Sequence, residues 1–272
     1  MTLTVSVIIP VFNCETTIER AILSVIHQTR RPQEIIIIND AGTDQSVAIA
    51  KSIAQDAPIP IHIHDNEINV GPGVSRNLGW AAATSDLVAF LDADDVWHPQ
   101  KLEIQVSVME TKSNLMMTCH DRTVGSSTDW TAICSGHIGW RVLKLRDFMI
   151  RNCCATPSVI LRRDISERFS STLRYAEDYG LWLSVSAKYG NVYFADCALV
   201  NCANPAYGGP GLSGKMLAMY RGELRAFHIV TRAGTLSKFW LPVMYVWSTL
   251  KFVVRLVDHK LLHDRLQRSV EV

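Results

Sequence analysis

The sequence lacks an excess of charge of either sign. Its 27 lysines and arginines oppose 26 aspartates and glutamates, which leaves a formal net charge of +1 at pH 7 over 272 residues. Nucleic-acid-binding proteins normally carry a basic surface, so this balance gives no support for nucleic acid as a partner. Because 48% of the residues are hydrophobic, the chain is able to bury a large core and is not expected to be disordered.

Cysteine spacing typical of disulfide-rich or zinc-binding proteins is also missing. The seven cysteines show no Cys-x-x-Cys pattern, and a chain of this length needs no disulfides to hold its core together. Residues 1–6 lack the basic patch and apolar run of a secretory signal. We therefore expect reduced thiols and a cytoplasmic protein.

Several cofactor motifs are absent. No Gly-x-Gly-x-x-Gly follows the first apolar strand and no Gly-Lys-Ser/Thr segment occurs, which disfavours nicotinamide dehydrogenases and P-loop nucleotidases. His62 and His64 alternate along one strand, and Cys119-His120 has no second pair at zinc spacing. Neither pattern predicts a zinc site.

The first hundred residues alternate between short apolar runs and helical segments. Such alternation is typical of βα units around a mostly parallel sheet, so the predicted fold class is α/β. The remainder is less regular, but it ends in a helical C-terminal tail. Strands are predicted at 5–9, 34–38, 61–64, 87–91, 115–119, 158–161 and 192–194, and the clearest later helices at 99–110 and 177–189.

Three aspartates, Asp92, Asp94 and Asp95, directly follow the strand at 87–91. Their mutual repulsion is unfavourable unless a cation is bound or the charges are well solvated. Mg²⁺ and Mn²⁺ take one or two protein carboxylates and fill the other positions with water and phosphate oxygens. The sequence thus favours a divalent metal site here, with an ordinary Asp-rich turn as the alternative.

The aspartates share their sheet edge with two other strand ends, residues 10–13 and Asn39-Asp40. In an open α/β sheet, ligands bind outside the carboxyl ends of the strands. Three loops are therefore predicted to converge on one crevice.

Five segments of the chain form an ordered set of motifs. They are 5–13 (VSVIIPVFN), 34–44 (EIIIINDAGTD), 69–79 (NVGPGVSRNLG), 90–95 (FLDADD) and 175–183 (YAEDYGLWL). In their order and spacing, over about residues 5–195, they resemble the family 2 glycosyltransferases. The resemblance implies a GT-A (Rossmann-like) α/β fold and an inverting, non-processive transferase of the bacterial surface-polysaccharide type. The Gln-x-x-Arg-Trp motif of processive synthases is absent.

The resemblance also implies roles for individual residues on the donor side. Asp40 matches the group that hydrogen-bonds the nucleotide base, with Pro10 and Asn13 lining the same pocket. Arg76 matches a donor-side contact.

Within the aspartate cluster, Asp92 and Asp94 match the family's Asp-x-Asp, which meets the ribose and a divalent metal, Mg²⁺ or Mn²⁺. Asp95 is an additional carboxylate that can ligate the same ion. The division of roles among the three stays open.

On the acceptor side, Asp178 matches the general base of inverting members, and Glu177 and Trp182 belong to the same segment. An acidic pair in the first turn of a helix also complements the helix dipole, so a purely structural role is the alternative.

The resemblance divides the chain into a catalytic domain over 1–204, with a nucleotide-binding half over about 1–98 and an acceptor half over about 99–204, and a tail over 205–272. Residues 204–214 are rich in Gly and Pro and predict a flexible loop, either a lid over the site or a linker. The apolar, aromatic segment 239–257 is interrupted by Pro242, Lys251 and Arg255. It predicts a helix that lies in a membrane interface or packs on protein.

Together these expectations describe a hexosyl- or N-acetylhexosaminyltransferase. It would move a sugar from a nucleotide sugar, a UDP-sugar by preference, to a hydroxyl of a glycan or lipid-linked acceptor at the cytoplasmic membrane face. A sugar-phosphate nucleotidyltransferase would usually show a Gly-rich loop with Arg and Lys after its first strand, and residues 13–20 lack one. A membrane-docked, non-catalytic module that binds nucleotide sugars is the third hypothesis.

Overall fold

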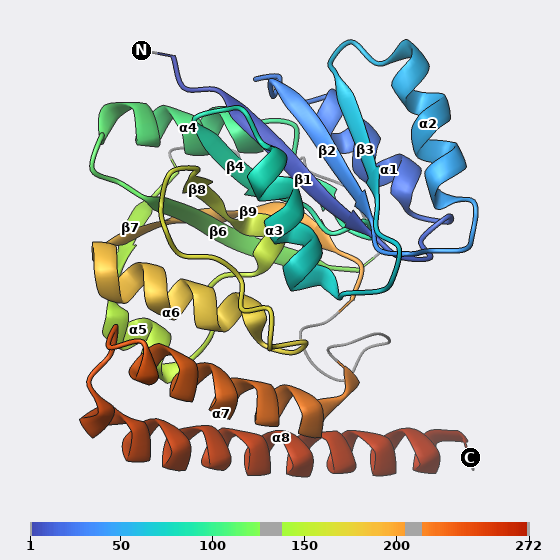
Figure 1. The fold of residues 1–272 in the computed structure, drawn as a ribbon. Helices are drawn as coiled ribbons and strands as arrows, with labels where there is room; N and C mark the ends of the chain where they lie inside the picture. Colours follow the sequence, from blue (N-terminus) through green and yellow to red (C-terminus); the bar gives the residue numbers. More distant parts are fainter. Residues whose placement is uncertain (1, 126–137, 205–213, 271–272) are drawn as a thin grey trace.

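A computed structural model describes residues 2–125, 138–204 and 214–270, with side-chain placement as far as Val257. Its centre is a nine-stranded sheet in the order β3-β2-β1-β4-β8-β6-β9-β5, with β7 paired to β9 (Figure 1). The strands are β1 Val5–Val11, β2 Glu34–Asn39, β3 Ile61–Asp65, β4 Leu87–Phe90, β5 Val96–Trp97, β6 Met117–Val124, β7 Trp140–Leu143, β8 Ile160–Arg162 and β9 Val192–Cys202.

The sheet is only half parallel. Strands β3, β2, β1 and β4 run parallel, as the βα rhythm predicts, and β6 is parallel to β9. The other pairings, of β8 with β4 and β6 and of β9 with β5 and β7, are antiparallel. The expectation of a mostly parallel sheet therefore holds for the nucleotide-binding half, and the sheet beyond β4 is mixed.

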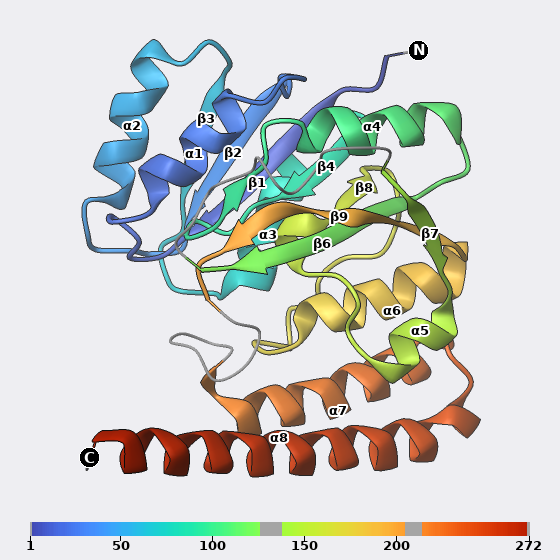
Figure 2. The ribbon, with the colours of Figure 1, turned by 180° about the vertical axis from the view of Figure 1, so that it is seen from behind.

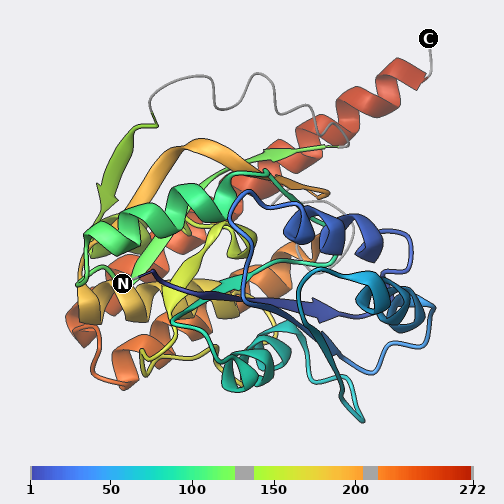
Figure 3. The same cartoon turned by 90° about the horizontal axis from the view of Figure 1, so that it is seen from above.

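Helices cover both faces of this sheet. In the two opposite views, α1, α2 and α4 lie on one face, and α3, α5 and α6 on the other (Figures 1 and 2). The view from above shows the same layers edge on (Figure 3). The helices are α1 Ile18–Ile26, α2 Ser46–Asp56, α3 Pro72–Ala82, α4 Lys101–Thr111, α5 Leu145–Ile150, α6 Glu177–Tyr189, α7 Met216–Arg232 and α8 Leu241–Val270.

The alternation of side chains along the strands creates two hydrophobic cores. In β1, Ile8 packs into the core beneath α3 and α6, whereas Val7 and Ile9 pack into the core beneath α1 and α4. Buried residues fill both faces of the central strands, which explains why these strands read as continuous apolar runs.

Helix α3 approaches β1 unusually closely. A Cβ at Gly79 would lie 2.5 Å from Cγ2 of Ile8, and a Cβ at Gly73 would lie 2.8 Å from Cγ of Glu177. Only glycine fits at these two contacts without movement of a neighbour. These contacts hold the first turn of α3 against the start of α6 and its later turns against the sheet.

Helices α7 and α8 form a third layer at one end of the molecule, below α5 and α6 in Figure 1. The Tyr220 and Phe252 rings stack with centroids 4.5 Å apart, and the Tyr220 and Thr249 hydroxyls are 2.8 Å apart. The predicted helical tail is therefore present as two packed helices. The Gly- and Pro-rich segment proposed as a lid, residues 205–213, lies outside the described residues.

The cysteines differ from the expectation of uniformly reduced thiols. Cys197 is disulfide-bonded. The free cysteines are Cys14, Cys119, Cys153, Cys154 and Cys202. The expectation was wrong for Cys197, because spacing along the chain does not show which cysteines meet in the fold.

Candidate active site

A cleft of about 1170 Å³ opens at the carboxyl ends of β1, β2 and β4. Its donor-side wall consists of the loops that follow these strands, and its opposite side is lined by residues 151–157, the start of α6, α7 and α8. The three strand-end loops do converge on one crevice. Each predicted site residue except Trp182 lines it.

The loop after β4 presents the aspartate cluster. Asp92 accepts a hydrogen bond of 2.6 Å from Nη2 of Arg76 through Oδ1. Asp94 accepts one of 3.0 Å from Nδ2 of Asn204, and Asp95 accepts one of 3.0 Å from the backbone N–H of Ala203. The segment after β9 therefore holds the two aspartates that Arg76 does not reach.

The cluster lacks enough positive charge nearby to neutralise all three carboxylates. Burial raises the pKa of Asp94, and the charge of Asp92 raises it further. For Asp95, burial followed by repulsion from Asp92 and Asp94 raises the pKa to about 8. A group with such a pKa is stabilised in its charged form by an added cation.

The carboxylates fit a divalent ion only in part. No three His, Cys, Asp or Glu side chains within 2–125, 138–204 and 214–257 form a ready-made metal site. Asp92 and Asp94 offer hard oxygen ligands in the cleft, whereas Asp95 is 5% exposed and bonded to Ala203. The arrangement suits an ion that takes one or two carboxylates and completes its shell with a ligand's phosphate oxygens.

Asp40 directly follows β2, and its carboxylate oxygens already accept several hydrogen bonds from the protein. Its carboxylate accepts hydrogen bonds of 2.8 Å from the N–H groups of Val70 and Gly71, and of 3.0 Å from Nδ2 of Asn66. Asp40 thus shapes the loop before α3, and one side of Oδ2 remains for a ligand.

Asn13 has a left-handed backbone conformation, with φ of 51°, and accepts a 2.8 Å hydrogen bond from the N–H of Thr43. It therefore joins the loops after β1 and β2 and does not cap α1, which begins at Ile18 after Thr17. Pro10 lies beside it at the cleft.

Arg76 connects the two sides of the cleft. Its side chain is 6% exposed, with Nη2 on Asp92 and Nη1 3.0 Å from Oε1 of Glu177. Its guanidinium carbon lies 5.4 Å from the ring centroid of Phe169. Each terminal nitrogen of Arg76 thus donates to a carboxylate. The position of Arg76 therefore favours alignment of the site over direct binding of a donor.

The start of α6 carries the predicted base. Oδ2 of Asp178 accepts a 2.8 Å hydrogen bond from Nδ2 of Asn152. Burial raises the pKa of Asp178, while the Asn152 hydrogen bond opposes this. Burial, with added repulsion from Asp178, raises the pKa of Glu177 to about 7 despite its ion pair with Arg76. Both carboxyl groups at the start of α6 therefore hold a proton more readily than exposed ones do.

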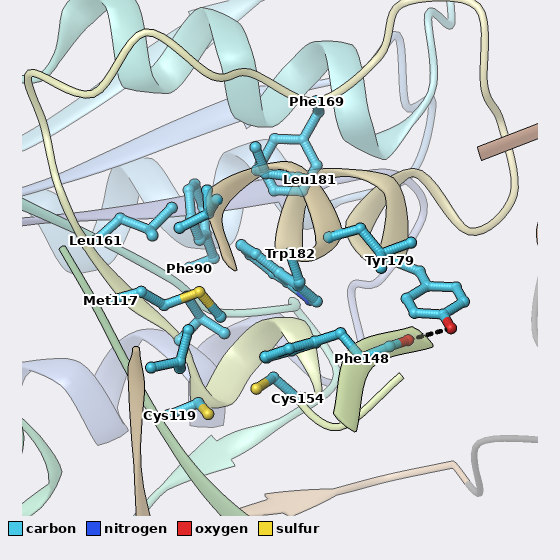
Figure 4. Packing of buried hydrophobic residues seen from close by; sticks show 14 of the residues in the cluster. Phe90, Met117, Cys119, Phe148, Cys154, Leu161, Phe169, Tyr179, Leu181 and Trp182 are labelled. Carbon is cyan, nitrogen blue, oxygen red and sulfur yellow. Dashed lines mark hydrogen bonds between the residues drawn. The ribbon is translucent and has the colours of Figure 1, made fainter. Parts of the chain in front are cut away.

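Trp182 corrects the sequence analysis. Its side chain is fully buried among Phe90, Phe169 and Phe148 and does not line the cleft (Figure 4). It lies one turn beyond Asp178 on α6, whose inner face packs on the sheet. Its proposed acceptor-side contact is therefore wrong, and Trp182 anchors α6 in the core.

Comparison with known proteins agrees with this arrangement. The sequence profile of Glycosyl transferase family 2 matches residues 6–169. The chain belongs to glycosyl transferase family 2. The predicted family and the predicted GT-A α/β fold are confirmed.

Among relatives of this family 2 chain, the UDP-Glc:α-D-GlcNAc-diphosphoundecaprenol β-1,3-glucosyltransferase WfgD of Escherichia coli is 30% identical over 201 residues. This match covers 72% of the chain and 74% of the relative. An uncharacterized glycosyltransferase of Nostoc is 40% identical over 127 residues, 47% of the chain and 39% of the relative. The chain spans only 26% to 39% of the Nostoc and Rickettsia relatives.

Two solved structures share the fold of the family 2 chain. TarS 1–349 of S. aureus superimposes with a TM-score of 0.67 at 18% identity, over 91% of this chain and 71% of TarS 1–349. The mannosyltransferase PcManGT of Pyrobaculum calidifontis, in complex with GDP-Man and Mn²⁺, gives 0.66 at 14% identity, over 96% and 81%.

Sequence reasoning missed several cleft residues of the family 2 chain. Asn152 and Asn204 hold Asp178 and Asp94, but both follow short or irregular segments without periodic signal. The cationic residues Arg151, Lys215, Lys251 and Arg255 also line the cleft. On α8, the spacing of Lys251 and Arg255 by four residues was the available signal, because it places both on one helix face.

Proposed function

We propose that this chain is an inverting, metal-dependent glycosyltransferase. It moves one hexosyl or N-acetylhexosaminyl unit from a UDP-sugar to an acceptor hydroxyl in surface polysaccharide or glycolipid synthesis. The observation that carries this proposal is the presence of Asp178 in the same cleft as Asp92 and Asp94. A carboxylate that accepts protons and a carboxylate pair for a cation are the two groups that such a displacement needs.

In this proposal, residues 1–98 form the donor half and 99–204 the acceptor half. Pro10, Asn13 and Asp40 receive the nucleotide base, and Oδ2 of Asp40 supplies the acceptor atom that remains available. Two structural relatives support a nucleotide-sugar ligand, since TarS has been solved with UDP-GlcNAc and PcManGT with GDP-Man.

Asp94 and Asp92 would hold the divalent metal, Mg²⁺ or Mn²⁺, with Asp95 behind them. When bound, the ion neutralises charge on the leaving diphosphate. The raised pKa of Asp94 supports this assignment, because the cluster is otherwise short of positive charge. Asn204 fixes one carboxylate oxygen of Asp94 and leaves the other for the ion.

The reaction would be a single displacement. The acceptor oxygen forms a bond to the anomeric carbon, the bond from that carbon to the diphosphate oxygen breaks, and Asp178 takes the hydroxyl proton. The attack occurs on the face opposite the leaving group, so the configuration is inverted. Asn152 holds the Asp178 carboxylate in a fixed orientation for this proton transfer.

The outer face of α8 supports a location on a lipid surface. Between Lys238 and Val257 the chain is apolar and long enough to cross a bilayer, yet only 11% of this stretch is buried. The exposed residues of α8 up to Val257 include no charged side chain. The large exposed hydrophobics are Val243, Val246, Trp247, Leu250, Val253, Val254, Leu256 and Val257.

We infer that this face, the α8 apolar face, lies in the membrane interface with the helix parallel to the surface. Lys251 and Arg255 on the inner side bind the protein body and the cleft, which favours a surface position over a span. The acceptor named for the E. coli relative, GlcNAc-diphosphoundecaprenol, is a lipid. A cytoplasmic enzyme attached peripherally to the inner membrane face accounts for both observations.

The test is release of nucleoside diphosphate from a panel of UDP-, GDP- and dTDP-sugars, with Mg²⁺ or Mn²⁺ and cell-envelope lipid extract as acceptor. We expect metal-dependent release from one donor and its loss in Asp94→Ala. Binding of UDP with Mn²⁺ provides a second readout. At about a hundredfold excess over Kd it should raise the Tm of the wild type by roughly 5–10 °C, but not that of Asp94→Ala.

Binding of a donor without turnover in any combination would indicate the non-catalytic module. Absence of both binding and release would overturn the proposal.

A further inference from the structure

As far as Val257, the charged residues of helix α8 lie on the side that faces the protein. Lys251 and Arg255 are one turn apart and half-buried, and both line the cleft. Met244 and Ser248 precede them on the same side at four-residue spacing and are buried. The polarity of a soluble surface helix is thus reversed, because the apolar residues face outward and the cations face inward.

Other cations gather around the same part of the cleft. Arg151 follows α5, and Lys215 precedes α7; both are exposed and both line the cleft. The α7 residue that carries a negative charge here is Glu223, whose Oε1 lies 2.6 Å from Nζ of Lys251. Among the described cleft-lining residues on α7 and α8 and at the adjoining positions 151 and 215, four are cationic and one, Glu223, is anionic.

The donor-side wall has the opposite composition. The loop after β4 contributes Asp92, Asp94 and Asp95 to this wall, and the buried cation beside them is Arg76, which pairs with Asp92. In the proposed function the diphosphate of the donor belongs to that wall, at the metal-binding carboxylates. The basic wall on α5, α7 and α8 is left for a different anion.

We propose that Arg151, Lys215, Lys251 and Arg255 form a binding site for the phosphate groups of a lipid-linked acceptor. This inference rests on the proposed function. Arginine and lysine are the residues that bind phosphate oxygens most strongly. Lys251 stays paired with Glu223 in this site.

The position of the site beside the α8 apolar face favours a lipid head group as the source of the phosphate. The two faces of α8 are separated by one helix diameter, about 10 Å. If the outer face rests on lipid, the basic side chains lie at the height of a head group that projects from that surface. A sugar attached to the far side of the head group would then extend into the cleft toward Asp178.

The test compares two acceptors that carry the same sugar, one on a polyprenyl diphosphate and the other on a neutral octyl group. The variant is Arg255→Gln, with Arg151→Gln as a second substitution at a fully exposed position. We expect each variant to raise KM for the diphosphate acceptor about tenfold, because a charge-assisted hydrogen bond is lost. KM for the neutral acceptor and for the donor should stay within about twofold.

The matched control is Arg232→Gln, at an exposed arginine in the last turn of α7 that does not line the cleft. It should leave both acceptor KM values unchanged. Inorganic pyrophosphate should inhibit the wild type competitively with the diphosphate acceptor, and less so in Arg255→Gln.

Three results would overturn the site. An equal rise in both acceptor KM values would mean a structural role, a rise in the donor KM would mean that the basic wall serves the donor, and unchanged values would mean no role. Failure of the proposed function has a separate signature, because the wild type would then release no nucleoside diphosphate from any donor.

Discussion

The two walls of the cleft are built in different ways. The donor-side wall comes from loops directly after β1, β2 and β4, and its carboxylates are buried or half-buried and accept hydrogen bonds from backbone N–H groups, Arg76 or Asn204. The opposite wall comes from α5, α7 and α8, and its cations sit on exposed or half-buried positions of helices. The first wall is rigid and acidic, and the second is basic and adjoins the α8 apolar face.

This difference teaches how one chain can separate two anionic ligands. Acidic strand ends repel a phosphate unless a cation accompanies it, so under the proposed function the donor binds together with its metal. The basic wall is proposed to bind phosphate directly, without an ion. Arg76 is the link between the two, since it joins Asp92 of one loop to Glu177 beside the predicted base.

The largest expected effect is that of replacing Asp178, the predicted base, in the cleft between the two walls. Asp178→Asn should lower kcat by about 10³-fold, because it removes general base catalysis and keeps the shape of the side chain. The KM for the donor should change little. Initial rates with saturating donor and acceptor provide the measurement, and Asp56→Asn, at an exposed aspartate on α2, is the control.

A fall in kcat of less than about tenfold would mean that another group takes the proton. In that case a residue other than Asp178 would be the general base, and Glu177 would be the next residue to substitute.

Removal of the link between the walls should reduce stability. Arg76→Gln leaves Glu177 and Asp92 without their buried cation, and we expect a loss of about 3 kcal/mol in the free energy of unfolding. Urea denaturation followed by tryptophan fluorescence measures this loss. Arg31→Gln, at an exposed position between α1 and β2, should change the free energy by less than about 0.5 kcal/mol. Equal stability of the two variants would contradict the linking role of Arg76.

The two walls also differ in their surroundings, because the basic wall adjoins the α8 apolar face. The double variant Val246→Asp and Val253→Asp should reduce binding to phospholipid vesicles by at least about tenfold, because each substitution removes an exposed apolar group that would enter the lipid and adds a charge. Vesicle flotation measures the bound fraction, and Gln55→Asp on α2 is the exposed control. Unchanged flotation, or loss of a dimer in its place, would assign the face to protein contact.

The smallest effect concerns the pH dependence of the base. A general base works in its ionised form, so activity falls on acidification through its pKa. Burial raises that of Asp178, so the acidic limb of kcat should lie above the ordinary aspartate value of about 4. In Asn152→Ala, loss of the hydrogen bond that favours the carboxylate should move the limb about one unit further upward.

An acidic limb that stays fixed in Asn152→Ala, with only a uniform drop in rate, would show that Asn152 acts through packing. The Asn152→Asp variant distinguishes the cases further, since a second carboxylate beside Asp178 should raise its pKa more than alanine does.

The sequence predicted the donor-side wall well because its signals are local. Buried strands read as apolar runs, and the polar residues that follow them, such as Asp40 and Asp92, must meet at one sheet edge. Helix α6 was also predicted with its observed bounds, Glu177–Tyr189.

The basic wall was not predicted, because it depends on contacts between distant segments. Strand β7 and helix α5 are short and carry no clear period, so the position of Arg151 and Asn152 had no local signal. The position of Trp182 was not predicted for a related reason: a motif shows that a residue belongs to a segment, not which way its side chain points.

The carbonyl of Ile150 at the end of α5 accepts hydrogen bonds from Nε1 of Trp247, at 2.8 Å, and from Nζ of Lys251, at 3.0 Å. Two residues later, Asn152 holds Asp178. The helix proposed to rest on lipid is therefore also the support of the segment that orients the base. Shortening the protein before Leu241 would not merely release it from vesicles, since the shortened enzyme would lose turnover even toward a water-soluble acceptor. Helix α8 would then serve both membrane attachment and, through the segment from Ile150 to Asn152, proton transfer.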